Sequence, residues 1–90
     1  MEKTIEEKFV ETLNDTALVH MVRDYQAIIK GLAEYKTELE KVTTKLTVEY
    51  TLEMPDIMYT HTFEQAHARV IHTVMFLIYE KLALRYLESL

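Results

Sequence analysis

The sequence predicts a mostly helical α+β domain, in which a β-hairpin separates two long helices. Three observations carry this prediction. The stretch from Phe63 to Leu90 has the composition of a helix that is covered on nearly every side. Two capping-box motifs mark the starts of helices. Between residues 43 and 62, apolar and polar residues alternate, which is the periodicity of a half-buried strand.

The first helix is predicted to begin at the capping box Thr4-Ile-Glu-Glu7. In such a box the threonine and glutamate side chains each accept a backbone N–H at the helix start. Apolar residues then recur every four positions and make one stripe: Ile5, Phe9 and Leu13. A helix of about nine residues follows from this spacing. Asn14-Asp15 ends it and can cap the next helix.

A second helix is predicted to begin near Thr16 and to continue to about Val42. Its apolar residues are spaced by three or four positions throughout, which is helical spacing. They are Leu18, Val22, Tyr25, Ile29, Leu32, Tyr35, Leu39 and Val42. Gly31, the single glycine, falls inside this span and weakens a helix by about 1 kcal/mol relative to alanine. Two explanations fit a glycine at this position: another helix approaches closely there, or the glycine is exposed and tolerated.

The predicted hairpin has strands at residues 44–53 and 57–61. In the first strand alternate residues are apolar: Leu46, Val48, Tyr50, Leu52 and Met54. Pro55-Asp56 gives a turn signal. The competing interpretation is an all-α helical hairpin or bundle with residues 16–53 as one helix, because Leu32, Leu39 and Leu46 recur at intervals of seven.

The last helix is predicted to start at a second capping box, Thr62-Phe-Glu-Gln65. Residues 70–79 contain eight apolar or aromatic side chains, more than the other elements of a 90-residue chain can cover. A contiguous excess of this kind favours association, most simply as a homodimer. The expected interface consists of Val74, Phe76, Leu77 and Tyr79.

Composition limits the class of protein. Ninety residues form a single domain, residues 1–90. The absence of cysteine excludes disulfides, and a net charge of −5 argues against nucleic-acid binding. The start of the chain has no apolar core of a signal peptide, and the apolar run of the last helix is shorter than a membrane span. We therefore expect a soluble cytoplasmic protein that contacts no membrane.

One candidate metal site is the Glu-x-x-His motif at Glu64 and His67. In ferritin-like carboxylate proteins this spacing puts a carboxylate and an imidazole on one helix face, and facing helices add further glutamates. Glu34 or Glu38 could supply such carboxylates. However, Glu64 suits a helix start through the helix dipole alone. The predicted polar face of the second helix holds the other acids. We therefore expect no cofactor and keep a divalent metal as the alternative.

A candidate ligand site combines Tyr59, His61, Arg69 and His72. Histidine titrates near neutrality, and arginine pairs with anions, so these residues could bind a small anion or nucleotide. The competing interpretation is structural: His67 and His72 fall among apolar residues and would be hydrogen-bonded core residues, while Arg69 would belong to a solvated stripe.

No catalytic constellation is evident. The chain has no cysteine, and its single serine, Ser89, is the penultimate residue. With one glycine, it has no phosphate-binding loop. We therefore expect a non-enzymatic homo-oligomer that occupies a protein partner or sequesters a ligand at an intersubunit groove. A metal-binding ferritin-like protein and a small-anion sponge are the alternatives.

Overall fold

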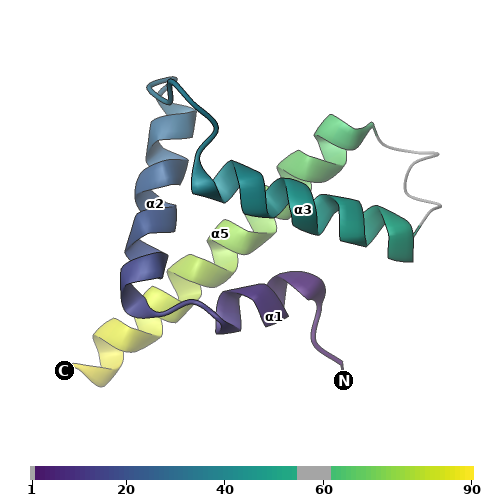
Figure 1. The fold of residues 1–90 in the computed structure, drawn as a ribbon. Coiled ribbons are helices and arrows are strands. Elements are labelled where there is room, and N and C mark those ends of the chain that lie inside the picture. The colour runs from purple at the N-terminus through teal and green to yellow at the C-terminus, as the bar shows by residue number, and fades with distance from the viewer. Residues whose placement is uncertain (1, 55–61) are drawn as a thin grey trace.

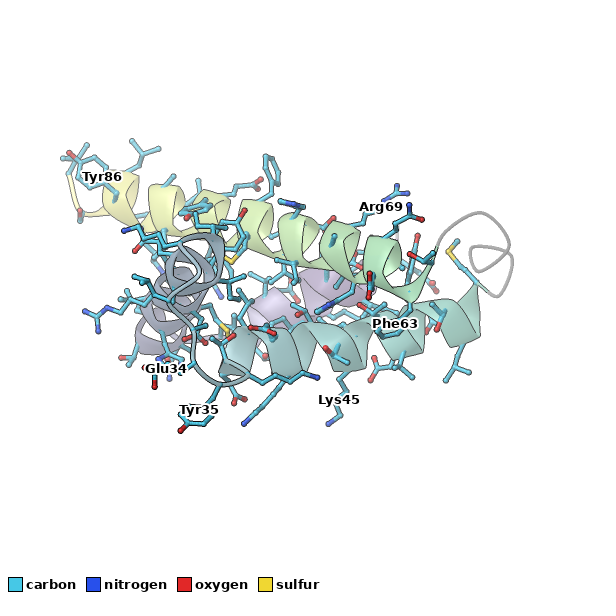
Figure 2. All side chains as sticks on the ribbon, turned by 90° about the horizontal axis from the view of Figure 1, so that it is seen from above. Glu34, Tyr35, Lys45, Phe63, Arg69 and Tyr86 are labelled. Atoms are coloured by element: carbon cyan, nitrogen blue, oxygen red, sulfur yellow. The ribbon has the colours of Figure 1, made fainter. Side chains whose placement is uncertain are left out.

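The structure, a computed structural model, describes residues 2–54 and 62–90. Within these residues every regular element is a helix: α1 (Ile5–Glu11), α2 (Asp15–Ile29), α3 (Glu38–Glu53) and α5 (Phe63–Glu88). The three shorter helices all contact α5, which crosses the molecule diagonally (Figure 1). The molecule is flat, with Cα dimensions of 46 × 39 × 16 Å. The arrangement is therefore two layers, with α5 alone in one of them (Figure 2).

The predicted helix starts are confirmed. The Thr4 hydroxyl accepts the Glu7 N–H at 3.1 Å, and the Thr62 hydroxyl accepts the Gln65 N–H at 3.2 Å. In both cases the side chain of the third helical residue accepts a hydrogen bond from the backbone N–H of the cap residue, which completes the capping box. Asn14 caps α2 through the Ala17 N–H at 2.8 Å.

The described residues fit the all-α alternative, but the helix predicted over residues 16–42, or over 16–53 in that alternative, is interrupted at Gly31. This glycine has φ +68°, a left-handed conformation that other residues adopt only with strain. The Leu32 N–H bonds the Ala27 carbonyl at 2.9 Å, and the Gly31 N–H bonds the Ile28 carbonyl at 3.1 Å. This pair of bonds is a Schellman motif, which ends α2. The glycine is therefore a helix terminator, and a loop connects α2 to α3.

The predicted β-hairpin is also wrong, because residues 38–53 form helix α3. The buried residues of α3 recur at helical intervals: Leu39, Thr43, Leu46 and Thr47. The Thr43 and Thr47 hydroxyls donate to the carbonyls four residues back, at 2.6 and 2.7 Å. Threonine favours strands only weakly, and here the buried hydroxyls are satisfied inside a helix. The second predicted strand, residues 57–61, lies outside the described residues, as does its Pro55-Asp56 turn.

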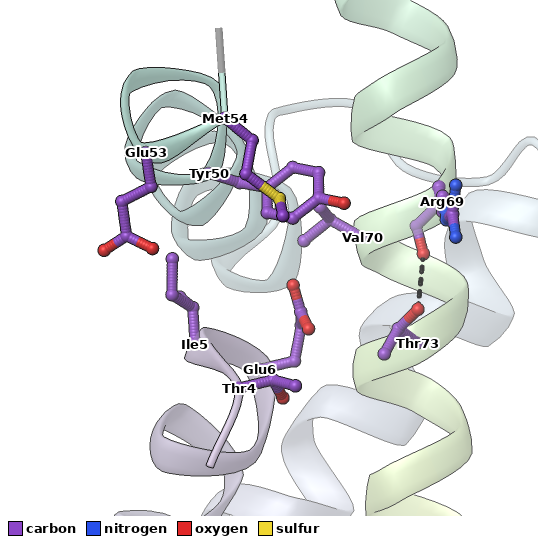
Figure 3. Close-up of a pocket in the computed structure, with 9 residues that line it drawn as sticks. All are labelled: Thr4, Ile5, Glu6, Tyr50, Glu53, Met54, Arg69, Val70 and Thr73. Atoms are coloured by element: carbon purple, nitrogen blue, oxygen red, sulfur yellow. Dashed lines mark hydrogen bonds between the residues drawn. The ribbon is translucent and has the colours of Figure 1, made fainter. Parts of the chain in front are cut away.

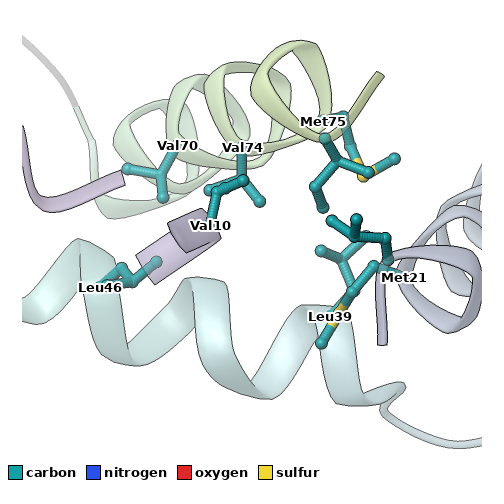
Figure 4. Packing of buried hydrophobic residues seen from close by; sticks show 9 residues of the cluster. Val10, Met21, Leu39, Leu46, Val70, Val74 and Met75 are labelled. Carbon is teal, nitrogen blue, oxygen red and sulfur yellow. The ribbon is translucent and has the colours of Figure 1, made fainter. Parts of the chain in front are cut away.

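The core lies between α5 and the three-helix layer (Figure 4). From α5 it receives Val70, Val74, Met75 and Ile78, all 2% exposed or less. From the other helices it receives Val10, Leu18, Met21, Leu39 and Leu46. The predicted role of the last helix as the organising element is confirmed in this sense, since every other described helix packs against it.

Two polar contacts fix the ends of the shorter helices. The Asp24 carboxylate on α2 accepts the Leu39 N–H at 3.1 Å and so caps the start of α3 from outside. The Lys81 ammonium on α5 donates to the carbonyls of Val10 and Leu13, at 3.0 and 2.9 Å. A cation at the carboxyl end of a helix is favourable, so Lys81 anchors α1 to α5.

Candidate functional site

His67 lies where α3 and α5 meet. Its Nε2 atom is 2.8 Å from the Thr43 hydroxyl and 3.4 Å from that of Thr44. Each threonine has one hydroxyl proton, and each gives it to a backbone carbonyl of α3 at 2.6 Å. Nε2 must therefore carry a hydrogen and donate it to Thr43. The imidazole thus joins the two helices as a structural hydrogen-bond donor.

Burial lowers the pKa of His67 below its ordinary value of 6.5, and Lys36 acts in the same direction. The carboxylate and carbonyl of Glu40 oppose this effect. Desolvation is the largest of these causes, since burial disfavours the charged imidazolium. The folded protein therefore favours neutral His67 more than the unfolded chain does.

The free energy of unfolding should therefore depend on pH through His67. Because its pKa is lower in the folded state, the unfolded chain binds more protons below about pH 6.5. Neutral His67 makes its full contribution to the free energy of unfolding above that pH. This contribution is lost progressively as the pH falls below it. Urea titrations at pH 5.5 and 7.5 should show lower stability at pH 5.5.

A matched variant isolates this effect. His67→Gln retains a hydrogen-bond donor but has no proton to gain, and the other histidines stay in both proteins. The difference in unfolding free energy between the two pH values should be smaller in this variant. An identical difference in both proteins would assign the pH dependence to other groups.

The proposed metal ligands do not converge among the described residues. Glu64 is exposed in the first turn of α5, while His67 turns toward α3. Glu34 lies in the loop after α2, and Glu38 starts α3; both are exposed. In the described part of the chain, no group of three or more histidine or acidic side chains could hold a metal ion.

The proposed anion ligands are also separated. Arg69 is exposed on α5 and borders a cavity between α1, α3 and α5 (Figure 3). His72 is exposed and meets the Tyr25 ring edge-on, with the ring centres 6.3 Å apart. Tyr59 and His61 lie outside the described residues. Among the described residues, then, two of the four candidates can be placed, and they have different neighbours.

The proposed interface residues divide between the two sides of α5. Val74 is 0% exposed in the intrachain core, so it is not available to a second chain. Leu77 is partly buried against that core. Phe76 and Tyr79 are 66% and 45% exposed on the opposite side. The helix therefore buries one side within its own chain and presents Phe76 and Tyr79 on the other.

The exposed apolar residues of α5 continue to the end of the chain. We call the following set the outward face: Phe76, Tyr79, Ala83, Tyr86, Leu87 and Leu90. Positions 76, 79, 83, 86 and 90 are separated by three, four, three and four residues, as in the seam of a coiled coil. Figure 2 shows Tyr86 on the side of α5 away from the other helices.

Sequence reasoning missed the last four members of this face. The signal was present in the three–four spacing that starts at Phe76. It was obscured because the opposite side of the same helix is also apolar, so that the sequence of α5 has no clear apolar and polar sides.

Comparisons with protein-family models, curated proteins and solved structures found no match. Among the described residues, no helix is both long enough and apolar enough to cross a membrane.

Proposed function

We propose that this protein is a non-enzymatic helical binding protein whose chains pair through the outward face of α5. The observation that carries the proposal is this face itself. Phe76 and Tyr86 are 66% and 65% exposed, and Leu90 is 84% exposed. No other described helix covers them, because α1, α2 and α3 all pack on the other side of α5. A contiguous apolar patch of this kind marks an interaction surface.

The size of the face supports a second copy of the chain as its occupant. Aromatic side chains present 150–250 Å² each, so the exposed fractions of the outward face correspond to roughly 600 Å². Two copies would bury about 1,200 Å², which reaches the lower limit of a specific interface. The coiled-coil spacing also suits an identical helix as partner.

A two-fold axis near Ala83 would make the face self-complementary. The small side chain at this position lets two helices approach closely, and larger side chains lie on both sides of it. In an antiparallel pair, Phe76 would lie opposite the partner's Leu90. A dimer of this type would present the three-helix layers of both chains outward, where they could occupy a protein partner or hold a ligand.

Pairing is tested by native mass spectrometry and sedimentation of the full chain at 5–200 μM. We expect a dimer, and we expect the double variant Phe76→Glu/Tyr86→Glu to raise the dissociation constant at least about 100-fold by burying unpaired charge. Its far-UV circular dichroism should be unchanged, because both residues are exposed in the single chain. A monomeric wild-type protein throughout this range would refute the proposal.

A single-cysteine series locates the interface without burying charge. The chain has no cysteine, so an introduced thiol is unique. Ala83→Cys should form a covalent dimer rapidly under mild oxidation. Lys45→Cys is the matched control, since Lys45 points away from α5 in Figure 2 and should cross-link slowly. Equal rates at both positions would place the contact elsewhere.

A further inference from the structure

A cavity of about 570 Å³ opens between the amino-terminal parts of α1 and α5 and the end of α3 (Figure 3). This volume falls within the usual range of small-molecule sites, about 300–1,000 Å³. Its apolar lining comes from three helices and the residue after α3: Ile5, Tyr50, Met54 and Val70. It lies within one chain and contains no residue of the outward face, so it does not depend on pairing.

Two acidic residues line this cavity: Glu53 is exposed, and Glu6 is buried. Glu6 is 9% exposed, and in Figure 3 its carboxylate points into the space between Tyr50 and Thr73. Within the described part of the chain, no donor is hydrogen-bonded to this carboxylate and no cation lies within 4.0 Å of it. Arg69 lines the same cavity but makes no ion pair with it. The Glu6 oxygens are therefore open to whatever enters.

The fold does not explain why an acid is buried at this position. Glu7, the next residue, completes the capping box of α1, so Glu6 is not needed for that role. An acid in the first turn is favoured by the helix dipole, but an exposed acid would gain the same benefit. Most of Glu6 is covered, but its carboxylate oxygens are not among fully buried atoms without a partner, so they reach the open space of the cavity. A cation in the cavity could pair with these oxygens without displacing a cation of the described residues.

We propose that this cavity binds a small organic monocation with an apolar body. Its ammonium or amidinium group would donate to the Glu6 carboxylate, a charge-assisted hydrogen bond. Its apolar part would pack on Met54, Val70 and the Tyr50 ring, whose face also attracts a cation. Arg69 at the edge of the cavity disfavours a second positive charge. The same buried carboxylate disfavours the small anion suggested by Arg69 alone.

The test uses three probes of similar size and different charge. 2-Phenylethylamine is a cation, 2-phenylethanol is neutral and phenylacetate is an anion at pH 7. Each is titrated into the ¹⁵N-labelled full chain to 20 mM and followed by ¹H–¹⁵N NMR. We expect saturable shifts at the amides of Glu6, Tyr50 and Val70 with the amine alone. This comparison needs no variant, so it does not depend on the folding of a mutant.

A matched pair of variants tests whether the Glu6 carboxylate is the charge that binds the amine. Glu6→Gln keeps the size of the side chain and should weaken amine binding about 10-fold or more through loss of the ion pair. Glu64→Gln changes an exposed acid in the first turn of α5 and should leave binding within about 2-fold of wild type. The melting temperature of Glu6→Gln should fall no further than that of Glu64→Gln, because each variant loses one first-turn charge and the Glu6 carboxylate has no described protein partner.

Several results would overturn the proposal. They are the absence of saturable binding of the amine, binding of the neutral or anionic probe as tight as that of the amine, and unchanged affinity in Glu6→Gln. A melting temperature clearly lower in Glu6→Gln than in Glu64→Gln would assign Glu6 a structural role instead. None of these outcomes bears on pairing through α5, which is measured independently.

Discussion

Replacing Leu46 with alanine should destabilise the protein by about 2–4 kcal/mol, whereas the same change at Leu52 should cost less than about 0.5 kcal/mol. Both leucines belong to α3, but Leu46 is 8% exposed and Leu52 is 77% exposed. The first substitution leaves a cavity against α5, and the second removes a side chain that is mostly in water. Urea unfolding followed by circular dichroism at 222 nm measures both values.

The same pair of variants tests the fold. In a β-hairpin, Leu46 and Leu52 would point to the same face, because positions separated by an even number share a side. Both leucines would then be buried, and the two alanine substitutions would lower the free energy of unfolding by similar amounts. In a helix they are six residues apart and lie on different sides. Comparable destabilisation by the two substitutions would contradict the helical structure of α3.

Replacing Lys81 with methionine should destabilise the protein by about 1–3 kcal/mol through loss of two charge-assisted hydrogen bonds. The Lys81 ammonium donates to the carbonyl of Val10, in the last turn of α1, and to that of Leu13, in the connection to α2. Methionine keeps most of the apolar stem but provides no donor. The carboxyl end of α1 would detach more often, so amides near Val10 should also exchange hydrogen faster than in wild type.

Lys45→Met is the control for this prediction. Lys45 is exposed on α3 and points away from the other helices (Figure 2), so its replacement should change stability by less than about 0.5 kcal/mol. If Lys81→Met behaved like Lys45→Met in both stability and hydrogen exchange, the contact between Lys81 and α1 would have no energetic importance.

The sequence by itself determined where α1, α2 and α5 begin. Capping at Thr4, Asn14 and Thr62 depends on residues within one turn, so the motif and the structure agree there. It also determined that the stretch from Phe63 to Leu90 organises the chain, because so many apolar residues in one helix require neighbours. The end of α2 at Gly31 was encoded locally too, but a glycine inside a helical pattern does not reveal its sign of φ.

The tertiary structure alone decided the state of residues 38–53. Their alternation and their leucines at intervals of seven support strand and helix almost equally. Packing of Leu39 and Leu46 on α5, with the Thr43 hydroxyl bonded both within α3 and to His67, selects the helix. Intrinsic strand preference spans only about 1 kcal/mol, so burial against another element outweighs it.

Tertiary structure also decided the roles of individual α5 side chains. The hydrogen-bond partners of Lys81 are about 70 residues earlier in the chain, and no local pattern contains such a pairing. Likewise, Val74 and Phe76 are equally apolar in the sequence. Which of them faces the core depends on where α1, α2 and α3 pack, and they cover Val74 and leave Phe76 exposed.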